Sequence, residues 1–90
     1  MDIKKVIKDA VKDKRVIIGY NRVMREIKTK KPRMVVTANN IPRNRLENII
    51  YNAKIAKVEV FEYPDDSLNL GLICGKPFTV SVLAIKGSEK

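Results

Sequence analysis

Histidine and tryptophan are absent from the sequence, and there is one cysteine, Cys74. Without histidine the commonest general base of enzymes is missing, and the usual zinc-ligand sets cannot be assembled. One cysteine cannot form an internal disulfide, which favours a reducing compartment. Cys74 ends the apolar run Leu72-Ile73-Cys74, where a small buried hydrophobic residue is favoured over an activated thiolate. We therefore expect neither a metal site nor a disulfide.

Long apolar segments and cofactor motifs are also missing. No stretch approaches the roughly 20 apolar residues that cross a bilayer, and the start, Met1-Asp2-Ile3-Lys4-Lys5, lacks the apolar run of a secretory signal. Neither a GxGxxG nor a P-loop pattern occurs. The adjacent carboxylates Asp65 and Asp66 fall in a turn, which favours a structural role over a shared proton. We expect no cofactor, no enzymatic activity, no membrane partner and a cytoplasmic location.

Positive charge is the strongest signal in the composition. The 19 lysines and arginines exceed the 10 acidic residues by nine charges, and the sequence pI is about 9.9. Such an excess attracts polyanions, because binding releases the counterions condensed on a nucleic acid. A nucleic acid is thus favoured over a basic surface without a polyanionic partner, and over an acidic membrane surface.

The length fits one domain. A chain of 90 residues buries only about 60% of the surface that its unfolded form exposes, which leaves room for one core. Its composition, 44% hydrophobic and 32% charged, is typical of a globular protein. We expect a single domain over residues 1–90, with a frayed tail at 87–90.

Hydrophobic periodicity predicts helices that alternate with strands. Asn39 and Asn40 are suited to cap the third helix, Pro42 to its first turn, and Ser67 to cap the fourth helix, which Gly75 ends. The predicted helices cover 3–12, 20–27, 42–56 and 67–73, and the predicted strands cover 16–18, 34–38, 58–63 and 79–85. This alternation predicts an α/β sandwich in which helices cover both faces of a central sheet.

Three loops carry polar, aromatic or cationic side chains. The first, 19–22, joins a strand to a helix, and Gly19 there permits a close approach to a ligand. Asn21 can read a base edge and Arg22 can bind a phosphate or a guanine. By itself this loop favours a strand-ending glycine followed by a solvated arginine.

The second loop, 38–45, offers two amides and two arginines, and its capping and phosphate-binding interpretations are balanced. In the third, 75–79, Phe78 can stack on an unpaired base or cover the end of the sheet. Because α/β units place loops after successive strands at one sheet edge, we expect all three loops to lie together.

The order and spacing of four motifs carry a family resemblance. They are Ile18-Gly19-Tyr20-Asn21-Arg22, Ala38-Asn39-Asn40-Ile41-Pro42, Tyr51-Asn52-Ala53-Lys54 and Ser67-Leu68-Asn69-Leu70-Gly71-Leu72-Ile73-Cys74-Gly75-Lys76-Pro77-Phe78. Over residues 2–86 the chain resembles the archaeal and eukaryotic large-subunit ribosomal protein family L-thirty-e. That family lies in the kink-turn RNA-binding superfamily that also contains the archaeal L-seven-Ae protein. The resemblance implies a three-layer α/β/α sandwich with a mixed four-stranded sheet.

The resemblance also implies a function: an archaeal structural protein of the large ribosomal subunit that recognises a kink-turn in ribosomal RNA. A kink-turn is a sharply bent internal loop with tandem sheared G·A pairs. The residues implied in RNA binding are Gly19, Tyr20, Asn21, Arg22, Asn40, Arg43, Arg45, Lys76 and Phe78. Neighbouring ribosomal proteins are further expected partners, and the free protein is expected to be a monomer.

Individual roles follow from the same resemblance. Gly19 would allow close packing, and Asn21 and Arg22 would face the G·A pairs. Asn40 would contact a base or its sugar, and Phe78 would stack on an exposed base. The arginines of the second loop would meet phosphates.

Two positions depart from the family pattern. The pair Asn21-Arg22 replaces the usual basic residue followed by a small or basic one, and L-seven-Ae members show Asn-Glu. Asn69 stands where a glutamate is usual. Asn21 therefore favours, and Arg22 opposes, an alternative role as the core protein of a guide-RNA or ribonuclease P particle. A third hypothesis is a basic protein-interaction module.

Overall fold

Four strands form one mixed sheet in the order β1-β4-β2-β3. The structure is a computed structural model that describes residues 3–30 and 32–87. Its elements, in chain order, are α1 (Ile3–Lys12), β1 (Val16–Ile18), α2 (Tyr20–Thr29), β2 (Met34–Thr37), α3 (Arg43–Ala56), β3 (Glu59–Glu62), α4 (Ser67–Ile73) and β4 (Val82–Ile85). β4 pairs antiparallel with both β1 and β2, and β2 pairs parallel with β3.

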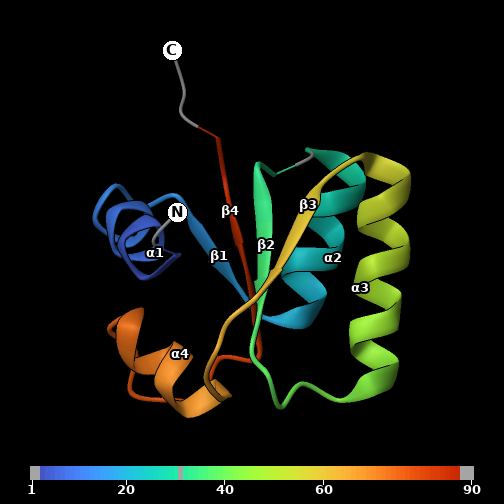
Figure 1. Cartoon of the computed structure of the whole chain (residues 1–90). Helices are drawn as coiled ribbons and strands as arrows, with labels where there is room; N and C mark the ends of the chain where they lie inside the picture. Colours follow the sequence, from blue (N-terminus) through green and yellow to red (C-terminus); the bar gives the residue numbers. More distant parts are fainter. Residues whose placement is uncertain (1–2, 31, 88–90) are drawn as a thin grey trace.

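Helices cover both faces of this sheet, with α1 and α4 on one side and α2 and α3 on the other (Figure 1). The alternation of side chains along the central strands separates the two halves of the core. On β2, Met34 and Val36 pack toward α1 and α4, and Val35 packs toward the other helix pair. All residues of β2 and β4 are buried, as a sheet covered on both faces requires. The predicted α/β/α sandwich is confirmed.

The last strand is shorter than the sequence predicts, because residues 79–81 leave the sheet. Val80 donates its backbone N–H to the carbonyl of Ser67 at 3.0 Å, and the carbonyl of Ser81 accepts from Ala38 at 2.8 Å. This segment therefore ties the start of α4 to the end of β2. β4 begins only at Val82.

The predicted helix caps are wrong at two starts. α3 begins after Pro42, and no side chain caps it. Asn40 instead binds Ser67: its Oδ1 accepts from the Ser67 N–H at 2.9 Å, and its Nδ2 donates to the Ser67 Oγ at 3.3 Å. Ser67 is the first residue of α4, and the cap is Asp66, whose carboxylate accepts from the N–H of Asn69 at 3.0 Å.

The end of α4 follows the prediction. Gly75 adopts a φ of 72°, in the left-handed region that glycine favours. Its N–H donates to Leu72, and the N–H of Lys76 donates to Gly71, both at 3.0 Å. This bonding pattern closes a helix end and turns the chain back over it.

Two sequence expectations involve residues outside the described ranges. The predicted break after the second helix includes Lys31, and the predicted tail includes residues 88–90. Within the described ranges, no helix has the length and apolar character that spanning a membrane requires.

Gly71 allows the chain to cross closely over α4. A Cβ at this position would collide with the carbonyl oxygen of Phe78. In most helices alanine is favoured over glycine by about 1 kcal/mol. We predict the opposite here: Gly71→Ala should lower the free energy of unfolding by about 1–3 kcal/mol, because overpacking displaces the crossing segment. Chemical denaturation measures this value.

Gly87→Ala is the matched control, because no atom lies within 4 Å of the Cβ it would add. It should change stability by less than about 0.5 kcal/mol. Equal stability of the two variants would contradict the proposed packing constraint.

Candidate nucleic-acid interface

The three loops singled out in the sequence meet at one edge of the sheet, which we name the loop edge. β1 and β2 both end there and β4 begins there, because both strands run antiparallel to β4. Ile18 pairs with Leu83 and Thr37 with Val82, so the residues that follow β1 and β2 flank the start of β4. The third loop joins α4 to β4, as the predicted helix and strand imply, and reaches this edge because β4 begins here.

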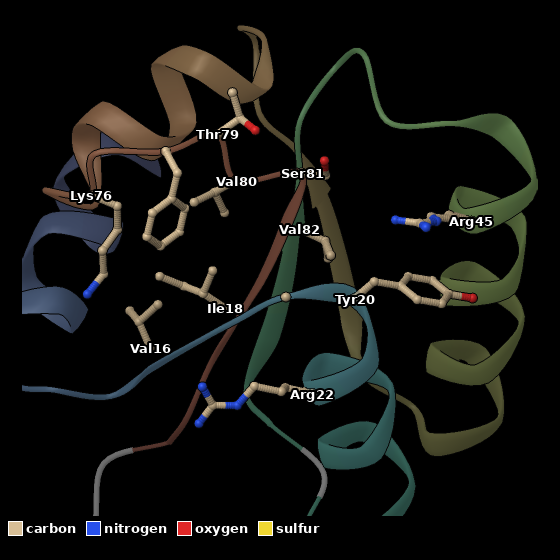
Figure 2. Close-up of a pocket in the computed structure, with 12 residues that line it drawn as sticks. Val16, Ile18, Tyr20, Arg22, Arg45, Lys76, Thr79, Val80, Ser81 and Val82 are labelled. Carbon is tan, nitrogen blue, oxygen red and sulfur yellow. The ribbon is translucent and has the colours of Figure 1, made fainter.

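A cavity of about 490 Å³ opens at the loop edge (Figure 2). It is lined by Val16, Ile18, Gly19, Tyr20, Arg22, Arg45, Lys76, Phe78, Thr79, Val80, Ser81 and Val82. Apolar side chains form its floor, and cationic, hydroxyl and aromatic groups surround them. Arg22 and Lys76 lie on two sides of Val16 and Ile18 in the close-up view. Such a site can hold a planar apolar group while its rim contacts anions.

The cavity brings together six of the nine residues predicted to bind RNA. These six are Gly19, Tyr20, Arg22, Arg45, Lys76 and Phe78, and they come from both sides of the sheet. The other three, Asn21, Asn40 and Arg43, do not line it. They belong to the loops or helix starts at the same edge and are exposed.

Gly19 shapes the junction between β1 and α2. Its φ of 109° and ψ of 141° lie in a region that L side chains rarely adopt. The N–H of Gly19 donates to Val82 at 3.3 Å, and its carbonyl accepts the first helical bond, from Val23, at 2.9 Å. No side chain caps α2. The first N–H groups of the helix therefore remain available to an anion, supported by the helix dipole.

Tyr20 links α2 to α3. Its ring lies under the guanidinium of Arg45, 5.1 Å from the ring centre, and its hydroxyl accepts from Nδ2 of Asn48 at 3.2 Å. Figure 2 shows the Tyr20 ring directed toward α3 and Arg45 beside it. A cation held over an aromatic ring at an exposed site gains about 0.5–1 kcal/mol. The contact therefore orients Arg45 at the rim of the cavity.

Lys76 and Phe78 reach the same cavity from the loop after α4. The Phe78 side chain is 54% exposed, so its ring is accessible to a ligand. Within the described residues, Lys76 and Arg22 form no ion pair. Both cations are thus available to an external anion.

The two predicted residues of the second loop make other contacts. Asn40 holds the start of α4 through Ser67, as described above. Arg43, the first residue of α3, donates from Nε to Glu47 at 3.3 Å, and its side chain is 91% exposed. An ion pair this exposed contributes little to stability, so Arg43 can leave Glu47 and bind a phosphate instead.

Ser81 and Asn48 were not among the predicted site residues, and Thr79 belonged to the third loop without a predicted role. The alternation of Thr79 and Ser81 with valines predicted a strand, and gave no sign that these residues leave the sheet to border a cavity. Asn48 could have been found, because it lies three residues after Arg45 and therefore on the same side of α3.

Cys74 does not supply a reactive group to this site. The residue is 2% exposed. Burial raises the pKa of its thiol above the ordinary value, and the charge of Lys76 opposes this shift. Among the described residues there is no cluster of three histidine, cysteine or acidic side chains that could hold a metal. The chemistry available here is binding by cations, amides and apolar surfaces.

Comparisons with known proteins identify the family of the chain. The family described as ribosomal protein L7Ae/L30e/S12e/Gadd45 matches residues 1–90. The chain is 42% identical to "Large ribosomal subunit protein eL30" of Methanothermobacter thermautotrophicus, over 96% of this chain and 88% of that protein. It is 39% identical to the protein of the same name from Methanocaldococcus jannaschii, over 94% and 77%.

A solved structure gives a similar fold. The "15.5kD RNA binding protein" of Giardia lamblia superposes with a TM-score of 0.88 at 15% identity, covering 97% of this chain and 72% of that one. At this identity the similarity shows the fold alone.

The backbone at Gly19 yields a prediction. A Cβ there would meet no atom within 4 Å, so only the φ angle resists substitution. We expect Gly19→Ala to lower the free energy of unfolding by about 1–3 kcal/mol, the cost of a strained conformation. Thermal or chemical unfolding measures it, with Gly87→Ala as the unstrained control. A stability equal to that of the control would mean that the junction relaxes without cost.

Proposed function

Because the chain belongs to the ribosomal protein L7Ae/L30e/S12e/Gadd45 family, we propose that it is a structural RNA-binding protein of the large ribosomal subunit that recognises a kink-turn in ribosomal RNA. Its archaeal relatives carry the name of a large-subunit protein, which places the proposed site of action in the cytoplasmic ribosome. Like these relatives, the chain is not an enzyme.

The observation that carries the proposal is the cavity at the loop edge, where cations surround an apolar floor. A strand of RNA that bends sharply presents phosphates from two directions and exposes an unstacked base. Arg22, Arg45 and Lys76 can contact the phosphates. Phe78 and the apolar floor can receive the base, and stacking on an aromatic ring contributes about 1–3 kcal/mol. A straight duplex offers phosphates but no free base.

The start of α2 gives the second contact. The unpaired N–H groups after Gly19 favour a phosphate, and the absence of a Cβ lets RNA approach the backbone. Asn21, exposed in the first turn, carries both a donor and an acceptor for the edges of the G·A pairs. Asn40 keeps one amide hydrogen and one lone pair beyond its bonds to Ser67, and Arg43 adds a cation. Tyr20 orients Arg45, and this completes the roles that we propose for the nine predicted residues.

A second candidate function, in a guide-RNA or ribonuclease P particle, is favoured by Asn21 alone. Arg22 opposes it, because an arginine cannot accept a hydrogen bond from guanine. Purification from cells followed by sequencing of the bound RNA separates the two. Ribosomal RNA supports the first proposal, and a guide RNA or ribonuclease P RNA supports the second.

We predict that Phe78→Ala and Arg22→Ala each weaken binding to a kink-turn RNA by about 1–3 kcal/mol, through the loss of stacking and of a charge-assisted contact. Gel-shift titration measures the affinity. Both side chains are exposed, so the folded state should be retained.

The matched controls are Tyr51→Ala, which removes an aromatic side chain that is 66% exposed on α3, and Arg25→Ala, which removes an exposed arginine further along α2. Both should bind as the unmodified protein does. The assignment of the cavity fails if Phe78→Ala and Arg22→Ala also bind without loss. A basic interaction module would bind bent and straight RNA alike.

Salt should weaken the complex steeply. If Arg22, Arg43, Arg45 and Lys76 each contact a phosphate, the logarithm of the binding constant should fall with the logarithm of salt with a slope of about −3 to −4. Arg22→Ala should reduce the magnitude of this slope by about one. Titrations between roughly 50 and 200 mM salt test both values. A flat response would contradict phosphate contact.

A further inference from the structure

A second group of cations lies at the opposite end of the sheet, where β1, β2 and β3 begin and β4 ends. One basic residue adjoins each strand at this end. Arg15 and Arg33 stand directly before β1 and β2, Lys86 directly follows β4, and Lys57 precedes β3 by two residues. In the order of the sheet they run Arg15, Lys86, Arg33, Lys57. We name these four residues the opposite row; at about 4.8 Å per strand it spans roughly 14 Å.

Backbone hydrogen bonds fix the centre of this row. The N–H of Arg33 donates to Ile85 and that of Lys86 donates to Arg15, both at 2.8 Å. The guanidinium of Arg15 also donates to the carbonyl of Lys86 at 2.8 Å. Arg15 and Arg33 line one hollow of about 200 Å³ together with Val6, Asp9, Met34 and Ile85. The backbones of Arg15, Arg33 and Lys86 are therefore held in place by hydrogen bonds at the end of the sheet.

Positive charges outnumber negative charges around the opposite row. The residues near the same ends of the elements include four more lysines, Lys12, Lys14, Lys28 and Lys30, and four acidic residues, Asp9, Asp13, Glu26 and Glu59. Asp13 pairs with Arg15 at 3.5 Å. Within the described residues, the side chains of Arg33, Lys57 and Lys86 form no ion pair. The net positive charge here is available to an external polyanion.

The preference of helix C-termini for cations explains only some of the basic residues in and around the opposite row. Lys30 and Lys57 stand at the C-caps of α2 and α3, where the helix dipole alone favours a cation. Arg33 and Lys86 adjoin strands, and the dipole of a strand supplies no such reason. Their positions instead continue the row across the sheet.

The composition of the cluster favours RNA over an acidic protein. Protein interfaces are enriched in aromatic residues and depleted of lysine at their centre, and nucleic-acid interfaces are strongly basic. Exposed apolar side chains are scarce near the opposite row. Among the described residues, Ile55 in the last turn of α3 is the only exposed large hydrophobic side chain in a helix turn that ends beside the row. Lysines and arginines without neighbouring amides position a phosphate backbone but do not read bases.

We propose that the opposite row is a second RNA-binding surface, which holds the phosphate backbone of another RNA segment while the loop edge holds the first. This inference rests on the proposed function only for the identity of the RNA at the loop edge. α2 and α3 both begin at the loop edge and end beside the row (Figure 1). The 14 residues of α3 span about 21 Å, so both surfaces can be occupied at once.

A sequential capture experiment tests the proposal. Kink-turn RNA is immobilised and saturated with protein, free protein is removed, and a labelled RNA duplex without an internal loop is added. The unmodified protein should capture the duplex. Arg33→Gln/Lys86→Gln should bind the kink-turn normally, which also shows that it folds, and should lose most of the capture. In titrations of duplex RNA, the salt slope should fall in magnitude by about two.

Lys5→Gln/Lys8→Gln is the matched control, because it removes the same charge from exposed positions of α1 before its last turn. Equal capture by the two double variants would overturn the proposal, and so would displacement of the duplex by polyglutamate as readily as by RNA. Failure of the proposed function would give a different result. The protein would not bind the kink-turn, but the affinity for free duplex RNA would still be lower for Arg33→Gln/Lys86→Gln than for Phe78→Ala.

Discussion

The structure depends on the position of β4 between β1 and β2. The last strand of the chain pairs antiparallel with two strands that precede it by long intervals, and all of its residues are buried. Leu83 contacts one half of the core, and Val82 and Ala84 contact the other. Because one antiparallel strand separates two parallel neighbours, β1 and β2 must end at the same edge. The loop edge follows directly from this pairing.

The same pairing makes stability and binding share residues. Val80 and Val82 belong to the buried core and also form the floor of the cavity. A larger or smaller side chain at either position would therefore alter both the packing and the shape offered to a ligand. Phe78 is placed differently. Its backbone is fixed by the crossing over Gly71, but its ring is exposed, so the ring can be removed without opening the core.

The sequence predicted the elements of the fold well because most of them have local signals. The apolar stripes of the helices and the β-branched runs of β1 and β2 follow directly from periodicity. The cap predicted at α4 was wrong by one residue, since Asp66 takes the place expected for Ser67, and the cap predicted at α3 failed for a long-range reason. Asn40 satisfies the local preference for a residue that caps a following helix, but it binds Ser67, 27 positions away. A local rule assigns a capping side chain only to the helix that follows it.

The candidate site was predictable to a similar extent. Each of the three loops has an ordinary structural interpretation by itself, and they could be singled out because the expected sheet places them at one edge. The contact of Arg45 with the ring of Tyr20 joins two helices, so neither helix predicts it alone; the spacing of three residues places Asn48 on the Arg45 side of α3, but does not predict its bond to the Tyr20 hydroxyl. The sequence did not predict that residues 79–81 lie outside β4, because the bounds of a strand depend on its partners: Val80 bonds to Ser67 at the start of α4.

The distribution of charge has a physical consequence for the whole molecule. A net charge of +9 on 90 residues favours expansion through self-repulsion. Here Arg22, Arg45 and Lys76 lie at one end of the sheet, and the four cations of the opposite row lie at the other. Separation by about 21 Å along α3 exceeds the roughly 8 Å screening length at physiological salt, so the two groups repel each other weakly. The repulsion is therefore largely confined to neighbouring cations within each group.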